Sequence, residues 1–185
     1  MSTTSWLLLS QSEPHVTGVE GIIHRSKRRE RRVLEESAID KLTGLQNQDQ
    51  WVMARHRADQ DATLWVLRAD VDRFKEINDS QGHAAGDSHL QLVARAISRG
   101  SKMVGISPRH QFRSGGDEFT IIGTYTNLQL LAKHLRHVIN SILGDGPGSV
   151  SIGIGNTDSA ADAEMYNEKK RCIRRRSYED HTHNR

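Results

Sequence analysis

The central motif of the chain reads Arg113-Ser114-Gly115-Gly116-Asp117-Glu118-Phe119, in which two adjacent glycines are followed directly by two adjacent carboxylates. Apolar residues at even spacing precede it (Val104, Ile106 and Phe112), and residues 119–122 are apolar or β-branched. This pattern predicts a β-hairpin whose Gly-Gly turn has positive φ angles. A turn without side chains lets a ligand approach the backbone, and the carboxylates beside it can hold a cation. A Gly-Gly turn alone is weak support for a metal site.

The composition predicts one domain with short extensions. The chain has 185 residues, of which 35% are hydrophobic, and a formal net charge of +3. That length is enough for one substantial core. Basic residues cluster at 25–32 and 169–176; such clusters are usually solvated helix faces, and phosphate or nucleic-acid binding is the alternative. The single cysteine, Cys172, excludes an internal disulfide and a cysteine zinc cluster, which fits a reducing cytoplasm.

The N-terminal region is predicted to lie outside this domain. Residues 1–18 show little periodicity and predict a flexible lead, whereas residues 19–38 predict a charged helical stalk. This helix is either simply solvated or pairs with a second copy of the chain, and its apolar positions are sparse. The apolar residues 6–9 are too few to span a bilayer and lack the basic flank of a signal peptide. We therefore expect a cytoplasmic protein without a membrane segment.

A buried strand is predicted at 64–70, from its length and its β-branched and aromatic residues. Asp70 and Asp72 stand at its end, on the same side because strand side chains alternate between faces. Two carboxylates in this position suggest a divalent cation site. Before the strand, we expect a turn at 40–47 and a helix capped by Asp49.

Further helices and a last strand complete the predicted domain. A polar, glycine-marked segment precedes an amphipathic helix that is expected to end at Gly100. The next helix is expected to begin with a capping box at Thr126. Residues 150–155 predict a strand, and a short helix is expected from about 160 to 176.

The order of these elements predicts the fold class. Helix, strand, helix, hairpin, helix, strand and helix follow one another over residues 39–176, which predicts an α+β domain. A central, mainly antiparallel sheet with helices packed on one face accommodates this order best. Residues 177–185 are predicted to form a polar tail.

Carboxylates from two separate elements suggest phosphoryl transfer. Asp70 at a strand end and Asp117 in a hairpin turn could converge to hold one or two magnesium ions. Backbone N–H groups and Lys75 would then neutralise phosphate oxygens. Asn78 and Asp87 offer an amide and a carboxylate, which suit the Watson–Crick edge of guanine. A turn residue and a helix cap are the alternative roles of Asn78 and Asp87.

Several motifs stand in a fixed order along the chain. They are Asp40-x-Leu42-Thr43-Gly44-Leu45-x-Asn47, Asp70-x-Asp72-x-Phe74-Lys75-x-Ile77-Asn78-Asp79, Gly82-His83-x-x-Gly86-Asp87-x-x-Leu90, Arg113-x-Gly115-Gly116-Asp117-Glu118-Phe119, Ser151-Ile152-Gly153 and Met165-Tyr166-x-x-Lys169. This set closely resembles the GGDEF family of diguanylate cyclases. The resemblance implies the nucleotidyl-cyclase-like palm, that is, the GGDEF fold.

The resemblance also implies a role for individual residues. Asp70 and Asp117 would ligate magnesium, or manganese in its place, with the Val71 carbonyl assisting. Glu118 would act as a further metal ligand or as the base, so that Asp117, Glu118 and Asp70 form the catalytic group. The residues that would bind substrate, guanine-reading ones first, are Asn78, Asp87, Lys75, Phe74, Arg73, His83, Gly115, Gly116 and Lys169.

The reaction implied by the resemblance joins two molecules of GTP into cyclic di-GMP and releases pyrophosphate. It requires a homodimer whose active-site halves face each other in antiparallel fashion, and the helix at 19–38 is a candidate for bringing them together. The alternative is a catalytically weak GGDEF module that binds GTP and acts as a regulatory interaction domain. A nucleic-acid binder is disfavoured because no aromatic stacking platform accompanies the basic runs.

Departures from the family pattern matter for regulation and for phosphate binding. Ile106 and Arg109 occupy the positions of the family's Arg-x-x-Asp product-inhibition site, so we expect no inhibition through that site. The chain is shorter than is typical between residues 151 and 166. Ile173 occupies the position of an arginine that, with a lysine here matched by Lys169, binds phosphates.

Overall fold

Residues 37–143 and 148–183 are described in a computed structural model of the chain, and side chains are described as far as residue 173. The chain divides into two compact units, at 1–37 and 38–185, and the second holds all the helices and strands described below. The predicted lead at 1–18 and nearly all of the predicted helix at 19–38 lie outside the described residues. None of the helices among the described residues is long and apolar enough to cross a membrane.

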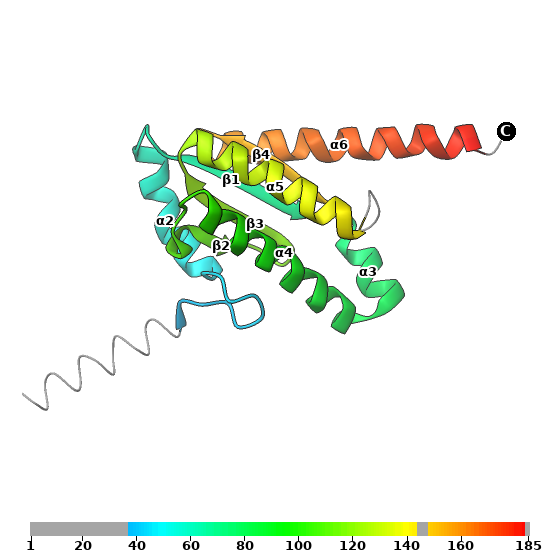
Figure 1. Ribbon diagram of the computed structural model, residues 1–185, viewed down its shortest axis with the longest axis horizontal. Helices are drawn as coiled ribbons and strands as arrows, with labels where there is room; N and C mark the ends of the chain where they lie inside the picture. Colours follow the sequence, from blue (N-terminus) through cyan, green and yellow to red (C-terminus); the bar gives the residue numbers. More distant parts are fainter. Residues whose placement is uncertain (1–36, 144–147, 184–185) are drawn as a thin grey trace, which may run out of the picture. The chain divides into compact units, whose positions relative to one another are not determined.

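The described domain alternates helices with short strands (Figure 1). In chain order these are α2 (Gln48–Gln60), β1 (Trp65–Val71), α3 (Phe74–Gln81), α4 (His83–Met103), a 3-10 helix η1 (Pro108–His110), β2 (Gln111–Arg113), β3 (Glu118–Gly123), α5 (Tyr125–Leu143), β4 (Val150–Gly155) and α6 (Asp158–His183). The predicted strands at 64–70 and 150–155 are confirmed. The last helix is longer than predicted at both ends and runs through most of the predicted polar tail.

The four strands form one antiparallel sheet in the order β2-β3-β1-β4. β1 is central, and its register places Asp70 opposite Glu118 on β3 and opposite Ser151 on β4. The predicted α+β class with an antiparallel sheet is therefore confirmed. The hairpin of the central motif joins β2 to β3, but β2 is only three residues long. The expected strand residues around Val104 and Ile106 instead form a turn before η1.

Helices cover both faces of the sheet, so the prediction of helices on one face is wrong. Leu67, Ala69 and Val71 of β1 belong to the larger core beneath α3, α4 and α5. Val66 belongs to a second core on the opposite face, with α2 and α6. The physical reason is that β1 is buried on both sides, which a continuous apolar run already allows. Figure 1 shows α6 beginning beside β4 and extending well beyond the sheet.

Helix α6 lies directly on the backbone of β4 because two glycines leave room for it. A Cβ atom on Gly153 would lie 2.1 Å from the carbonyl oxygen of Ala161 and 2.2 Å from the nitrogen of Met165. A Cβ on Gly155 would lie 2.3 Å from the nitrogen of Ala161. These close approaches fix the distance between α6 and the sheet, and therefore the height at which α6 side chains reach β1.

Two predicted helix starts are wrong by two residues. Asn47, rather than Asp49, caps α2, and its side chain accepts a hydrogen bond from the nitrogen of Gln50. Thr124, rather than Thr126, caps α5, since its hydroxyl accepts from the nitrogen three residues later. Each true cap is the residue that precedes the first helical residue, as the geometry of N-caps requires.

Helix α4 continues through Gly100 to Met103, which corrects the predicted end at Gly100. This glycine allows close packing between helices: a Cβ there would lie 2.6 Å from side-chain atoms of both Leu131 and His134 on α5. Helix α3 was not predicted. It has eight residues, follows Arg73 in the left-handed conformation (φ 56°), and has no side-chain cap.

Candidate active site

The turn of the central motif is held by main-chain hydrogen bonds. The nitrogens of Ser114 and Gly115 donate to the carbonyl oxygen of Glu118, at 3.0 and 3.3 Å. Neither Gly115 nor Gly116 has a positive φ, so that prediction is wrong. Gly115 is needed for space instead, because a Cβ there would lie 2.9 Å from Oε2 of Glu118, whereas one on Gly116 would meet open space.

Arg113 braces this turn against the segment before α2. Its guanidinium donates to the carbonyl oxygen of Gly116 at 2.6 and 3.1 Å, and to both carboxylate oxygens of Asp40 at 3.3 Å. Asp40 also accepts from the nitrogen and hydroxyl of Thr43, at 2.9 and 2.6 Å. Burial acts to raise the pKa of Asp40, but these hydrogen bonds and the charge of Arg113 lower it overall. The ionised carboxylate therefore ties two of the sequence motifs together.

The three acidic residues predicted to be catalytic meet at one end of the sheet. Asp70 is 6% exposed and lies directly opposite Glu118 in the register of β1 and β3. The carbonyl oxygen of Asp117 accepts from the nitrogen of Val71 at 3.1 Å. Burial raises the pKa of Asp70, and the negative charges of Asp117 and Asp72 raise it further. An ionised Asp70 is thus held in a site that favours an additional positive charge.

Lys169 of α6 supplies such a charge. Its Nζ lies 2.5 Å from Oδ1 of Asp70. Burial acts to lower the pKa of Lys169, but the hydrogen bond to Asp70 and the charges of Asp70, Asp72 and Asp117 raise it overall. The pKa of Asp70 stays raised despite this partner because burial, together with the negative charges of Asp117 and Asp72, outweighs the effect of the ammonium. The structure therefore brings Lys169 into contact with the acidic cluster.

Asp72 is engaged differently from Asp70. Its two carboxylate oxygens accept from the hydroxyls of Ser149 and Ser151, at 2.6 and 2.7 Å. Its main-chain nitrogen also donates to the carbonyl of Ser149 at 2.7 Å. Asp72 is 4% exposed, so it fastens the start of β4 to the end of β1. Of the two carboxylates predicted together at this strand end, Asp70 is thus the one free of such hydroxyl partners.

The donor set around Asp70 fits a hard divalent cation. Mg²⁺ takes oxygen ligands, typically one or two carboxylates together with water and substrate phosphates. Asp70 and Asp117 are two carboxylates, the Val71 carbonyl is adjacent in the chain, and the ammonium of Lys169 already sits where a cation is favoured. Across residues 37–143 and 148–183, however, no three His, Cys, Asp or Glu side chains are grouped closely enough to hold a metal ion by themselves. Water and phosphates would have to complete the coordination.

The predicted guanine-binding residues lie apart from this cluster, on α3 and α4. Asn78 packs against Gly86, where a Cβ would lie 2.0 Å from its Oδ1 and 3.1 Å from the ring of Phe74. Asp87 follows Gly86 and is exposed. Gly86 is therefore required for the contact between the two helices, where Asn78 and Phe74 pack against it, and Asp87 is the next residue of α4.

The remaining predicted substrate residues are exposed. Lys75 and Arg73 stand at the start of α3, and His83 is the first residue of α4. Arg73 forms an ion pair with Glu76 at 3.3 Å. Since neither helix has a side-chain cap at its start, main-chain N–H groups remain available there for a ligand.

A family model described as diguanylate cyclase, GGDEF domain, matches residues 37–172. The chain belongs to the GGDEF family. Among curated relatives, the probable diguanylate cyclase DgcI of Escherichia coli (strain K12) is 32% identical over 110 residues, which is 55% of this chain and 24% of that protein. An uncharacterised 19.3 kDa protein of Streptomyces ambofaciens is 34% identical over 158 residues, covering 77% of this chain and 84% of that one. The chain spans about a quarter of the length of DgcI and DgcC of E. coli, both named probable diguanylate cyclases.

Solved GGDEF structures have the same fold. The coiled coil and GGDEF domain of DgcB from Caulobacter crescentus, in complex with c-di-GMP, gives a TM-score of 0.66 at 24% identity, covering 82% of this chain and 90% of that one. The GGDEF domain of PA1120 from Pseudomonas aeruginosa gives 0.57 at 32% identity, covering 72% and 89%. The palm fold that the motifs imply is therefore confirmed.

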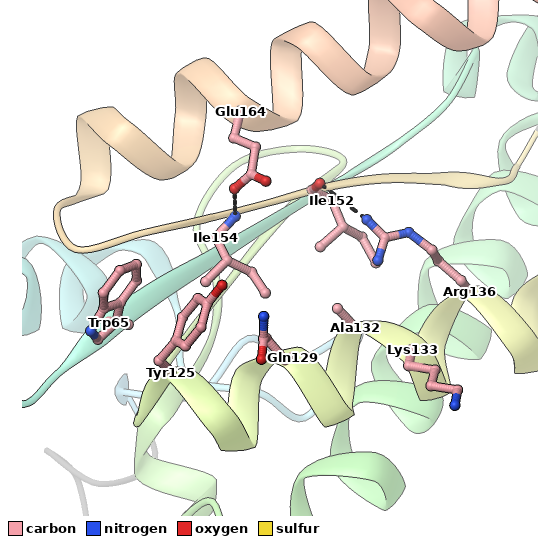
Figure 2. Close-up of a pocket in the computed structure, with 9 residues that line it drawn as sticks. All are labelled: Trp65, Tyr125, Gln129, Ala132, Lys133, Arg136, Ile152, Ile154 and Glu164. Atoms are coloured by element: carbon pink, nitrogen blue, oxygen red, sulfur yellow. Dashed lines mark hydrogen bonds between the residues drawn. The ribbon is translucent and has the colours of Figure 1, made fainter.

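In this GGDEF domain, side chains of α5 and α6 cover the outer edge of β4. Oε2 of Glu164 accepts from the nitrogen of Ile154 at 2.6 Å, and Oε2 of Glu168 accepts from the nitrogen of Ile152 at 3.3 Å. Arg136 donates to the carbonyl of Ile152 at 3.4 Å and pairs with Glu168 at 2.7 Å. Figure 2 shows Glu164 and Arg136 approaching the strand from opposite helices. These contacts fix the position of α6 along β4. Because Glu168 directly precedes Lys169, they also help to place the lysine.

A cavity of about 320 Å³ lies along the same edge, between α5 and α6. It is lined by Trp65, Tyr125, Gln129, Ala132, Lys133, Arg136, Ile152, Ile154 and Glu164 (Figure 2). None of the predicted site residues lines it, and Trp65 stands at the opposite end of β1 from Asp70. This cavity is therefore separate from the carboxylate cluster.

Sequence reasoning missed Arg68, which contacts Glu118 at 2.9 Å and Asp158 at 2.9 Å. An arginine inside an otherwise buried strand was the available signal.

Two departures from the family pattern also have structural consequences. Ile106 is buried in the core at 6% exposure, whereas Ile173, at the family's phosphate-binding arginine position, is 56% exposed.

Proposed function

We propose that the domain condenses two molecules of GTP into cyclic di-GMP and pyrophosphate, with magnesium and as a homodimer. The observation that carries this proposal is the meeting of Asp70, Asp117 and Glu118 with Lys169 at one end of the sheet. Membership of the GGDEF family supports it, as do the relatives named diguanylate cyclases. GTP as substrate agrees with the cytoplasmic location expected from the sequence.

Asp70 and Asp117, with the Val71 carbonyl, are the residues that would hold the metal. Magnesium supplies positive charge that neutralises phosphate oxygens as charge develops on them. Lys169 shares the site, and its ammonium is well placed to turn from Asp70 to phosphate oxygens of a bound nucleotide. Main-chain nitrogens at the start of α3, which no side chain caps, offer further donors for phosphate.

Guanine would lie against α3 and α4. The carboxylate of Asp87 can accept from N1–H and N2–H₂ of guanine, and the amide of Asn78 can donate to an acceptor on the base. Adenine presents an acceptor at N1, which would face the carboxylate without a hydrogen atom between them. This arrangement supports GTP over ATP as the substrate.

The proposed reaction forms two phosphodiester bonds. The 3′-hydroxyl of each GTP attacks the α-phosphorus of the other, the hydroxyl proton leaves to a base, and pyrophosphate departs from each nucleotide. Glu118 is the candidate base because it lies opposite Asp70. One domain offers a single set of guanine-reading residues, so two domains must face each other with the reacting atoms in line.

The decisive experiment is to incubate the purified full chain with GTP and Mg²⁺ and to separate the products by chromatography and mass spectrometry. We expect cyclic di-GMP and pyrophosphate in a ratio of one to two, and no cyclic product from Asp117→Asn. A folded wild-type protein that makes no cyclic di-GMP over a range of protein concentrations would refute the proposed activity.

A second candidate is a regulatory module that binds GTP with little turnover. The observation that favours it is Ile173, an exposed apolar residue where the family has a phosphate-binding arginine. Calorimetric titration with GTP and Mg²⁺ separates the two candidates. Binding without product would support the module, whereas turnover excludes it.

A further inference from the structure

Arg68 is a charged residue placed inside the central strand. It stands two residues before Asp70, so both side chains lie on the same face of β1. Its side chain is only 14% exposed. A guanidinium removed from water to this extent requires charged partners. Three carboxylates provide them, and one belongs to the candidate base, Glu118.

The guanidinium of Arg68 contacts both the central motif and α6. Nη2 lies 2.9 Å from Oε2 of Glu118, and Nη1 lies 2.9 Å from Oδ1 of Asp158. Nε lies 3.5 Å from Oδ1 of Asp162, an ion-pair distance without a hydrogen bond. Asp158 is itself 5% exposed and has a second cation, Arg55, at 3.3 Å. Asp158, in the first turn of α6, is therefore buried and paired with two arginines.

The carboxylate of Glu118 is confined on two sides. The register pairs Arg68 with Thr120, so Glu118 is its diagonal neighbour across the strands, within reach of a long side chain. On the other side lies the turn, where a Cβ on Gly115 would come within 2.9 Å of Oε2 of Glu118. The side chain of Glu118, 37% exposed, thus lies between the guanidinium of Arg68 and the turn of the motif.

Lys169 and Arg68 differ in how firmly each is held. Among the described residues, Lys169 forms an ion pair with Asp70 alone, through a flexible stem, and is 34% exposed. Arg68 contacts carboxylates on both β3 and α6, through a planar group whose donors have fixed directions. Lys169 can exchange partners when nucleotide arrives, whereas Arg68 would have to break several ion pairs at once.

We propose that Arg68 is a positioning residue, which fixes the carboxylate of Glu118 beside Asp70 by anchoring it to Asp158 at the start of α6. This inference rests on the proposed function, since it assigns Glu118 a role in that reaction. The proposed role of Arg68 depends on the fork shape of its guanidinium. One guanidinium serves two carboxylates at 2.9 Å each, and the single ammonium of a lysine would not reproduce that fork.

The contact is tested without nucleotide by a double-mutant cycle in urea unfolding. The variants are Arg68→Met, Glu118→Gln and both together, and the matched control is Arg55→Met with and without Glu118→Gln. We expect the midpoint shift of the Arg68 double variant to be clearly smaller than the sum of its single shifts. Arg55 contacts Asp158 but not Glu118, so its shifts should add. Additive shifts for Arg68 and Glu118 would overturn the proposal.

The positioning role is tested by comparing turnover with affinity. Arg68→Met and Arg68→Lys should each lower kcat by about tenfold or more, the size of a lost charged hydrogen bond. Affinity for Mg²⁺ with 3′-deoxy-GTP, which lacks the attacking hydroxyl, should stay within about threefold, and Arg55→Met should leave kcat within about twofold. Normal turnover in Arg68→Lys would overturn the proposal.

The two tests also separate this inference from the proposed function. If Arg68→Met does not fold, Arg68→Lys decides, because it keeps the positive charge next to Asp158. Lack of cyclic di-GMP from the wild type would refute the proposed function, and the urea cycle would still show whether Arg68 fixes Glu118. Cyclic di-GMP production with an additive cycle would refute the inference alone.

Discussion

Gly153→Ala tests how α6 is held against the sheet. The new methyl group would lie 2.1 Å from the carbonyl oxygen of Ala161 and 2.2 Å from the nitrogen of Met165, whereas ordinary contacts begin at 3.4 Å. Helix α6 would therefore have to retreat by roughly 1.3 Å, because main-chain atoms cannot rotate aside. Inserted methyl groups typically cost about 1–3 kcal/mol. We expect about 3 kcal/mol, the upper end of that range.

The assay is urea unfolding followed by tryptophan fluorescence, with Gly116→Ala as the control. A Cβ on Gly116 meets nothing within 4 Å, so that variant should stay within about 1 kcal/mol of the wild type. Retreat of α6 would also draw Lys169 away from Asp70, so the KM for GTP should rise in Gly153→Ala. A destabilisation below about 0.5 kcal/mol, the size of an ordinary surface substitution, would refute the seating of α6 on β4.

Asp117→Ala is expected to abolish cyclic di-GMP formation with little change in the urea midpoint, because its side chain lies in a half-exposed turn; near-normal turnover would show that Asp117 binds no essential metal. Burial raises the pKa of Asp70 in the folded state, so the folded protein binds this proton more tightly than the unfolded chain does. In metal-free buffer, the wild type should therefore lose free energy of unfolding as the pH rises above about 4, compared with Asp70→Asn, which lacks the titrating group. A constant difference between pH 4 and 7 would contradict this. ATP should react at least about a hundredfold more slowly than GTP, and Asp87→Asn should narrow the gap; equal rates for the two nucleotides in the wild type would rule out Asp87 as the guanine-reading residue. A chain lacking residues 1–37 should have lower specific activity than the full chain when the protein is dilute, and should regain it at high protein concentration. Equal activity of the two proteins at every dilution would show that this region has no dimerising role.

Local pattern was sufficient to predict β1, β3, β4 and the acidic cluster, but not the short β2. The apolar runs before Asp70 and after the Gly-Gly pair define β1 and β3, and adjacency of these strands brings Asp70 and Glu118 opposite each other. Residues of neighbouring motifs, such as Asn78 and Gly86, meet because they stand on consecutive helices. Such contacts follow from short sequence separations, which spacing encodes directly.

Contacts between residues that are far apart in the sequence could not be predicted from local pattern. Arg68 is 50 residues from Glu118 and 90 residues from Asp158, and nothing in the local pattern pairs them. The role of Gly115 was misjudged for a related reason. A glycine can serve positive φ or close approach, and only the position of the Glu118 side chain distinguishes the two. Helix α3 escaped prediction because it is short and begins after a left-handed residue without a side-chain cap.

Main-chain groups on both edge strands of the sheet, β4 and β2, are hydrogen-bonded outside the sheet. Along β4, the carboxylates of Glu164 and Glu168 accept the outward main-chain hydrogens. Along β2, the main chain of Gln46 donates to Gln111 and accepts from Arg113, at 2.9 and 2.8 Å. Edges closed in this way resist the strand-to-strand joining that leads to aggregation. The proposed encounter of two domains can therefore be made by side chains, without opening these main-chain hydrogen bonds.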